Sequence, residues 1–237
     1  MPMPSRVVSY RPGPPPTLAG EPGSLARRFA TIREQLHVPG EFPRDVLAAA
    51  ADAADLVVLP TVDLTDLGFW TLDPVGSMDL DQAMVLAREG TGYRVRYAIA
   101  DVPAFVTPGG AIDVEARRRG HTIYLPDTRV PLHPPALSEG AASLLPDQVR
   151  PAYVWDLGLD EHATVTSTHV GRALVRSRAR RDYASVQASV DAGTADEQVR
   201  LLQEIGQKRA ALESARGGAS LPMPEQPVVH EGPGVYR

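Results

Sequence analysis

The segment Thr71–Ala83, TLDPVGSMDLDQA, places the three carboxylates of Asp73, Asp79 and Asp81 close together in the chain. Apolar residues precede and follow the segment, so we expect a constrained loop between two strands. Carboxylates held this close repel one another unless a cation neutralises them, and Mg²⁺ prefers oxygen ligands. The segment therefore predicts either a divalent-metal site or an exposed acidic turn.

Composition narrows the class of protein. The chain has 237 residues, 43% of them hydrophobic and 22% charged, as in ordinary globular proteins. No apolar run approaches the roughly 18 residues that span a bilayer, and the N-terminus lacks a signal-peptide core. The absence of cysteine excludes disulfides and thiolate chemistry and fits a reducing compartment. We therefore expect a cytoplasmic protein with no membrane partner.

Net charge and lysine content argue against two modes of ligand binding. The net charge of −5 argues against nucleic-acid binding through an overall positive potential, although a local basic surface is compatible with it. Lys208 is the only lysine, and no GK[ST] motif occurs, so a P-loop nucleotide site is excluded.

The chain divides into a short first part and a longer second part. Proline and glycine dominate residues 1–20, which we expect to be extended. Apolar residues at helical spacing then predict one helix from Ser24 and a second over Asp45–Asp55. We expect residues 1–62 to form a Pro-rich tail with a small helical N-terminal region, and residues 63–237 to form the main domain.

The second part mixes strand and helix signals. Two antiparallel strand pairs are expected, at residues 83–88 with 93–101 and at residues 152–159 with 164–175. Three helices are expected, at residues 111–119, 182–191 and 196–215. Thr194 and Glu197 have the spacing of a capping box for the last helix. The pattern predicts an α+β fold with a mixed, largely antiparallel sheet flanked by helices.

The alternation of side chains along an extended chain places two of the carboxylates on the same face. Asp79 and Asp81 are two residues apart and share one face of an extended chain, whereas Gln82 points to the other face. A Mg²⁺ ion held by such carboxylates keeps positions open for water and a phosphate oxygen. This arrangement suits metal-assisted hydrolysis of a phosphodiester.

Other residues allow two interpretations each. The basic cluster Arg176, Arg178, Arg180 and Arg181 either contacts phosphates or forms a solvated face at the start of a helix. Asp101 either supports the metal site from a strand end or only terminates that strand.

Four sequence blocks resemble a known family. They are TLDPVGSMDLDQA, YAIADVPAFVTPGGAIDVEARRRGHTIYLPD, VPLHPPALSEGAASLLPDQVRPAYVWDL and RSRARRDYASVQ. Their order and spacing are similar to those of the RNB catalytic domain of the ribonuclease II and ribonuclease R family, which are processive 3′→5′ exoribonucleases. The resemblance runs from about Asp63 to the end of the chain. It implies a mixed α+β catalytic domain, a buried Mg²⁺ site and a channel for single-stranded RNA.

The resemblance also implies roles for particular residues. Asp73, Asp79 and Asp81 correspond to metal-site aspartates, and Asp81 to the one most critical for hydrolysis. Gln82 stands where the family usually has a fourth aspartate, so it offers the metal an oxygen without a charge. Tyr124, which by itself predicts a core tyrosine, resembles the aromatic residue that stacks on a base near the scissile phosphate. Stacking of this kind tolerates any base.

Three functions follow as hypotheses. The first is a Mg²⁺-dependent exoribonuclease, with Mn²⁺ as the alternative ion, that releases nucleotide monophosphates from single-stranded RNA and does not act on DNA. Arg176, Arg178 and Arg180 are its predicted RNA contacts beside Tyr124. The family's domain continues with a second half that supplies an arginine and a glutamate, and an S1-type domain follows. The chain ends at Arg237 before these, so the second hypothesis is a catalytically incompetent RNA-binding fragment. The third is a metal-binding regulatory protein.

Overall fold

The computed structural model describes residues 24–125, 127–219, 230–232 and 235–236, so the predicted extended tail lies outside the described residues. The chain separates into two compact units. The smaller unit comprises residues 1–39, 124–130 and 224–237, and the larger comprises residues 40–123 and 131–223. The predicted division between residues 62 and 63 stays a prediction.

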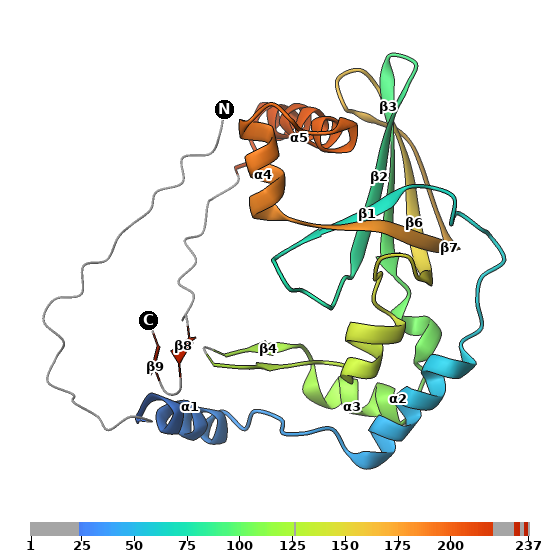
Figure 1. The fold of residues 1–237 in the computed structure, drawn as a ribbon. Helices are drawn as coiled ribbons and strands as arrows, with labels where there is room; N and C mark the ends of the chain where they lie inside the picture. Colours follow the sequence, from blue (N-terminus) through green and yellow to red (C-terminus); the bar gives the residue numbers. More distant parts are fainter. Residues whose placement is uncertain (1–23, 126, 220–229, 233–234, 237) are drawn as a thin grey trace, which may run out of the picture. The chain divides into compact units, whose positions relative to one another are not determined.

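Five strands of the larger unit form a closed barrel in the order β1-β2-β3-β6-β7 (Figure 1). They are β1 (Phe69–Asp73), β2 (Gln82–Glu89), β3 (Gly92–Ala100), β6 (Val149–Leu159) and β7 (Val165–Asp182). Neighbouring strands are antiparallel, except that β1 and β7 run parallel where they close the barrel. The predicted α+β fold with a largely antiparallel sheet flanked by helices is confirmed.

Small side chains fill the barrel centre. Ala100, Ala152 and Ala173 lie opposite one another across β3, β6 and β7, and all are buried. Phe69 and Leu80 belong to the same core cluster, as do Leu144, Val154 and Val175. Because alanine lets neighbouring strands curve tightly around a narrow interior, these few larger side chains suffice to fill it. Leu80 belongs to the acidic segment, which is therefore anchored in the core.

Two helices cover one end of the barrel, α4 (Tyr183–Asp191) and α5 (Glu197–Ala215) (Figure 1). Gln198 of α5 fastens the helix to β2, because its amide group bonds both the N–H and the C=O of Leu86, at 2.9 and 2.7 Å. The same amide oxygen accepts a bond from the Trp70 indole at 3.2 Å. Leu201 and Ile205 pack beneath it. One side chain thus replaces the hydrogen bonds of a neighbouring strand.

Helices α2 (Arg44–Leu56) and α3 (Ala111–Arg119) pack at the other end with two short turns, η1 (Val102–Phe105) and η2 (Leu137–Ala141). Arg119 is buried beneath them, donates to Glu115 at 2.8 Å and to the carbonyl of Gly40 at 2.8 Å, and lies 3.7 Å from the ring centre of Phe42. Its Glu115 partner has a pKa lowered to about 2, chiefly because Arg118 and Arg119 donate hydrogen bonds to its carboxylate. The contacts of Arg119 with Gly40 and Phe42 tie α3 to the chain segment before α2.

The smaller unit contains α1 (Ser24–Gln35), where Arg33 donates to both carboxylate oxygens of Asp127 at 2.8 Å. It also contains a two-stranded sheet of β8 (His230–Gly232) and β9 (Val235–Tyr236). A second two-stranded sheet joins β4 (Ile123–Tyr124) to β5 (Arg129–Val130). No helix among the described residues is long and apolar enough to cross a membrane.

Two local predictions were wrong. Helix α5 begins at an Asp196 cap, whose carboxylate accepts from Val199 N at 3.0 Å, and not at a Thr194–Glu197 capping box. The hydroxyl of Thr194 instead donates to the carbonyl of Ser189. The basic cluster does not form a helix-start face, because β7 continues as far as Asp182 and carries all four arginines.

Candidate active site

The acidic loop, residues 74–81, connects β1 to β2 as predicted and is fixed by its backbone. The buried hydroxyl of Ser143 accepts from Leu80 N at 3.0 Å and donates to the carbonyl of Met78 at 2.6 Å. Leu144 N donates to the carbonyl of Leu80 at 2.9 Å. Asp79 lies between Met78 and Leu80, the two residues whose backbone groups form hydrogen bonds with Ser143. The backbone around Asp79 is therefore fixed by Ser143 and Leu144, which lie more than 60 residues later in the sequence.

Asp73 and Asp79 form the electrostatic centre of this region. Burial raises the pKa of the Asp73 carboxyl above its ordinary value of 3.8, and the negative charge of Asp79 raises it further. No residue that the structure describes donates a hydrogen bond to Asp73 or forms a salt bridge with it. A carboxylate without a donor, placed near a second carboxylate, favours the uptake of a proton or a cation.

Asp81 and Gln82 begin strand β2. The carbonyl of Asp81 accepts from Ala100 N at 2.8 Å, and its side chain is exposed. The amide oxygen of Gln82 accepts a hydrogen bond from the hydroxyl of Tyr97. Gln82, a predicted metal ligand, is thus engaged with a phenol in this structure.

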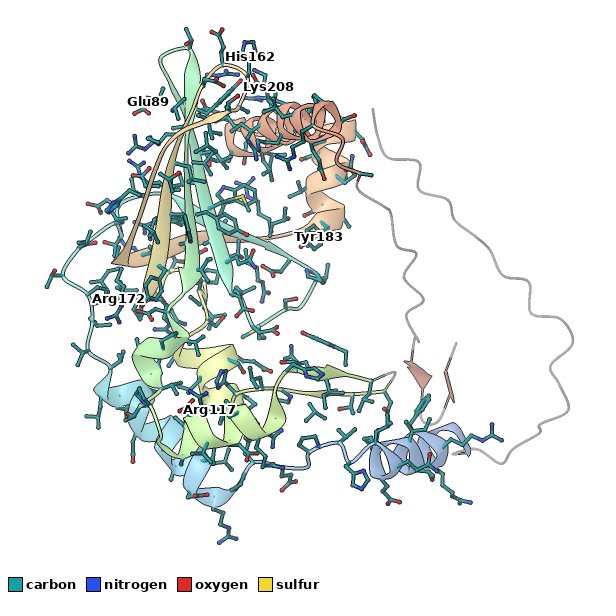
Figure 2. All side chains as sticks on the ribbon, turned by 180° about the vertical axis from the view of Figure 1, so that it is seen from behind. Glu89, Arg117, His162, Arg172, Tyr183 and Lys208 are labelled. Carbon is teal, nitrogen blue, oxygen red and sulfur yellow. The ribbon has the colours of Figure 1, made fainter. Side chains whose placement is uncertain are left out.

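The site also contains two tyrosines, Tyr97 and Tyr183, that the sequence analysis did not predict. Burial raises the pKa of the Tyr97 phenol, and the nearby Tyr183 and Asp73 raise it further. Tyr183 opens α4 and is 57% exposed (Figure 2). It follows Asp182, which lies opposite Asp73 where β1 and β7 pair. In the sequence, the alternation along β3 is the only signal that places Tyr97 on a defined face of a strand. No local sequence pattern links Tyr183 to Asp73.

The fit of a metal ion rests on the donor set. Among the described side chains, no three His, Asp or Glu residues converge as a metal-binding group. Asp73 and Asp79 nevertheless offer hard oxygen donors whose mutual repulsion a divalent cation relieves, which is the chemistry that Mg²⁺ selects. The residues present fit such an ion, and the predicted ligand set of Asp73, Asp79, Asp81 and Gln82 stays a prediction.

The predicted RNA contacts lie on different parts of the fold. Arg178 donates to the carbonyl of Thr65 at 3.1 Å, and Arg180 donates to that of Ser77, in the acidic loop, at 3.0 Å. Arg176 is half-buried, and its Nε has no hydrogen-bond partner among the described residues. Tyr124 is 74% exposed on β4, so it is not the core residue that its surroundings in the sequence suggested.

Asp101 belongs to the fold and ends a strand. It is fully buried, and its carboxylate accepts from Ala104 N at 3.2 Å and from Arg172 Nε at 2.6 Å. It thereby caps the turn η1 directly after β3. Both oxygens are used, so the interpretation as a strand terminator agrees with the structure.

Comparison with known proteins identifies the family. The RNB domain profile matches residues 61–235. Exoribonuclease 2 of Proteus mirabilis is 35% identical over 162 residues, which are 64% of this chain and 25% of that protein. A protein of Arabidopsis thaliana named inactive exonuclease DIS3L2 is 36% identical over 157 residues, covering 65% of this chain and 14% of its own length.

Solved structures agree with this assignment. Mycoplasma genitalium RNase R in complex with double-stranded RNA superposes with a TM-score of 0.79 and 27% identity. The match covers 89% of this chain and 39% of that one. The fold and the site thus define an RNB-type domain, and the chain belongs to the RNB family. It spans about a quarter or less of the length of the two curated relatives.

Proposed function

We propose that this chain carries the metal-binding part of an RNB-family 3′→5′ exoribonuclease that hydrolyses single-stranded RNA to nucleotide monophosphates in the cytoplasm. The observation that carries the proposal is the pair Asp73 and Asp79, two carboxylates held close to each other on a braced loop. Family membership supplies the reaction class, because relatives of this chain are named exoribonucleases.

Asp73, Asp79 and Asp81 would hold Mg²⁺ or Mn²⁺, with the amide oxygen of Gln82 as a further candidate ligand. A bound ion supplies an activated water and stabilises charge on the leaving group. The protein's own part is to hold the carboxylates in place. The bonds from Ser143 to the acidic loop do so through the backbone of Met78 and Leu80 and use no carboxylate oxygen.

The nucleic-acid contacts are part of the same proposal. The exposed ring of Tyr124 offers a face on which a base can stack. Arg178 and Arg180 each use one terminal nitrogen for a loop carbonyl, and their remaining N–H groups are suited to phosphate oxygens. Arg176 has a buried Nε without a partner among the described residues, which a phosphate oxygen would satisfy.

The test uses the 237-residue chain with 5′-labelled oligouridylate and Mg²⁺, followed on a denaturing gel. Progressive shortening that stops with EDTA and with Asp81→Asn supports the proposal. Asp52→Asn is the matched control, since Asp52 is exposed on α2. Equal shortening by Asp81→Asn and the unmodified chain would contradict the proposed role of the acidic loop.

A second function is RNA binding without hydrolysis, and the engagement of Gln82 with Tyr97 favours it. A neutral amide bonded to a phenol is a weaker metal ligand than a carboxylate. Binding of the labelled RNA without shortening supports this alternative. Gln82→Asp then restores a fourth carboxylate, and we expect tighter Mn²⁺ binding in a calorimetric titration. Unchanged Mn²⁺ affinity in that variant would remove Gln82 from the ligand set.

A further inference from the structure

A row of aromatic and aliphatic side chains, of which Tyr97 is half-buried and the others are exposed, crosses the outer face of β3, β6 and β7. Tyr97 lies opposite Trp155, and Ile99 lies opposite Tyr153. Trp155 in turn lies opposite Val170 on β7. Residues directly opposite across strands, and residues two apart along a strand, share one face of a sheet. These five side chains, here called the aromatic face, therefore form one continuous surface.

The aromatic face is open to solvent although it lies in the middle of an ordered sheet. Trp155 is 40% exposed and Tyr153 is 37% exposed. Helix α5 covers the neighbouring part of the same side of the sheet, where Tyr93 and Leu157 pack against it. Contiguous exposed apolar surface marks interaction sites, whereas single scattered apolar residues are common on any protein surface.

Arg172 borders the aromatic face next to Tyr153. Its Nε is held by the buried carboxylate of Asp101, and its guanidinium lies 5.9 Å from the ring centre of Tyr153. The side chain stays 42% exposed (Figure 2) and lines a cavity of about 340 Å³ together with Pro103 and Val58. A cation held by Asp101 therefore stands beside the rings and stays partly exposed.

The other end of the aromatic face reaches the candidate active site. Tyr97 donates to Gln82, which begins the strand after the acidic loop, and the charge of Asp73 is close enough to act on its phenol. A ligand lying along Tyr97, Trp155 and Tyr153 would thus run between the carboxylates and Arg172.

We propose that the aromatic face binds single-stranded RNA, with bases stacked on Trp155 and Tyr153 and a phosphate on Arg172. The proposal rests on the proposed function, which supplies RNA as the ligand. Neighbouring strands are about 4.8 Å apart and residues two apart along a strand about 6.7 Å, so adjacent rings are spaced for successive bases. Stacking on aromatic rings is sequence-tolerant, and the planar guanidinium matches a phosphate group. A purely apolar partner would leave the terminal N–H groups of Arg172 without acceptors.

The chain contains a direct spectroscopic reporter of this binding. It has two tryptophans, of which Trp70 is 1% exposed and Trp155 is 40% exposed. A base stacked on Trp155 should quench the indole fluorescence and protect it from acrylamide. The titration uses oligouridylate in EDTA, so that hydrolysis does not remove the ligand, and fluorescein anisotropy measures affinity in parallel.

The decisive variant is Trp155→Leu, which keeps an apolar side chain and removes the ring. We expect RNA affinity to fall about tenfold and the quenching to disappear, with an unchanged melting temperature. Tyr153→Leu should lower affinity by a similar factor, and Leu47→Ala, an exposed apolar position on α2, should leave it unchanged.

The remaining outcomes overturn the proposal in distinguishable ways. RNA binding of unchanged affinity in Trp155→Leu, without quenching in the unmodified chain, refutes the aromatic face and leaves the proposed function standing. An absence of any RNA binding refutes both. Self-association in sedimentation velocity that Trp155→Leu abolishes, with RNA binding intact, assigns the face to contacts between copies of this chain.

Discussion

Two carboxylates at strand ends of the same barrel differ in their hydrogen-bond and charge partners. Asp101, directly after β3, is fully buried, and an arginine and a backbone N–H satisfy it. Asp73, the last residue of β1, is half-buried beside Asp79, and no described residue donates a hydrogen bond to it. A carboxylate with a cation beside it stabilises the fold. A carboxylate beside another carboxylate costs stability, which is the pattern expected of a ligand site.

The surroundings of the two residues differ in the same way. Asp101 is held through its own side-chain oxygens. The acidic loop is held through its backbone by Ser143 and Leu144, and these hydrogen bonds use none of its carboxylate oxygens. The following substitutions test whether this distinction is real.

Asp101→Asn should have the largest effect. It leaves Arg172 without its charged acceptor and places an uncharged amide in a buried site. We expect a loss of about 2–3 kcal/mol in the free energy of unfolding, below the roughly 3–5 kcal/mol of a fully buried pair because Arg172 keeps contact with water. Urea denaturation measures it, with Asp52→Asn as the control. A loss no larger than that of the control would show that the pair is not structural.

Ser143→Ala should come next. It removes a buried hydroxyl that serves Met78 and Leu80 at once, and we expect a loss of about 1–2 kcal/mol. We also expect the Mn²⁺ affinity, measured by calorimetry, to fall, because the backbone on both sides of Asp79 loses its hydrogen bonds to Ser143. Ser138→Ala is the control, since its two hydrogen bonds are long, at 3.5 Å. A stability loss with unchanged Mn²⁺ affinity would make Ser143 a structural residue only.

Much of this arrangement was readable in the sequence. Helix α3 spans Ala111–Arg119 as predicted and ends at Gly120, whose φ of 81° explains the glycine there. The hairpin of β2 and β3 and the loop position of the three aspartates also follow from local patterns. These features depend on residues a few positions apart, where periodicity and turn chemistry act directly.

The long-range part was not readable. No local pattern reveals the role of Ser143, because its two partners lie 63 and 65 positions earlier in the chain. The arginines of β7 looked like a helix start, since nothing local shows that β7 runs on to pair in parallel with β1. Tyr97 and Tyr183 meet near Asp73 only because the barrel closes there.

Arg180→Ala should have a smaller effect than Ser143→Ala. Arg180 is exposed and donates to the carbonyl of Ser77 at 3.0 Å, so we expect less than about 1 kcal/mol. The matched control is Arg178→Ala, which removes an equivalent bond to Thr65, outside the acidic loop. If the loop needs Arg180 for its position, Mn²⁺ affinity falls in Arg180→Ala and not in Arg178→Ala. Equal affinities would restrict the bracing of the loop to Ser143 and its neighbours.

Asp73→Asn should have the smallest effect on stability, and of opposite sign to Asp101→Asn. The folded-state pKa of Asp73 is raised, so its contribution is most favourable below the ordinary value of 3.8 and is lost as pH rises through the folded pKa. At neutral pH without metal, the variant should therefore be more stable by less than about 1 kcal/mol, because water screens part of the repulsion. Near pH 3 the difference should vanish.

The effect of Mg²⁺ completes the test of Asp73. The ion should raise the melting temperature of the unmodified chain and not that of Asp73→Asn, since only a protein that binds the ion gains stability from it. Thermal unfolding at neutral pH and near pH 3, with EDTA and with Mg²⁺, measures all four cases. If Asp73→Asn instead destabilises the EDTA-treated protein at neutral pH, the carboxylate of Asp73 supports the fold as that of Asp101 does, and the distinction between the two strand ends fails.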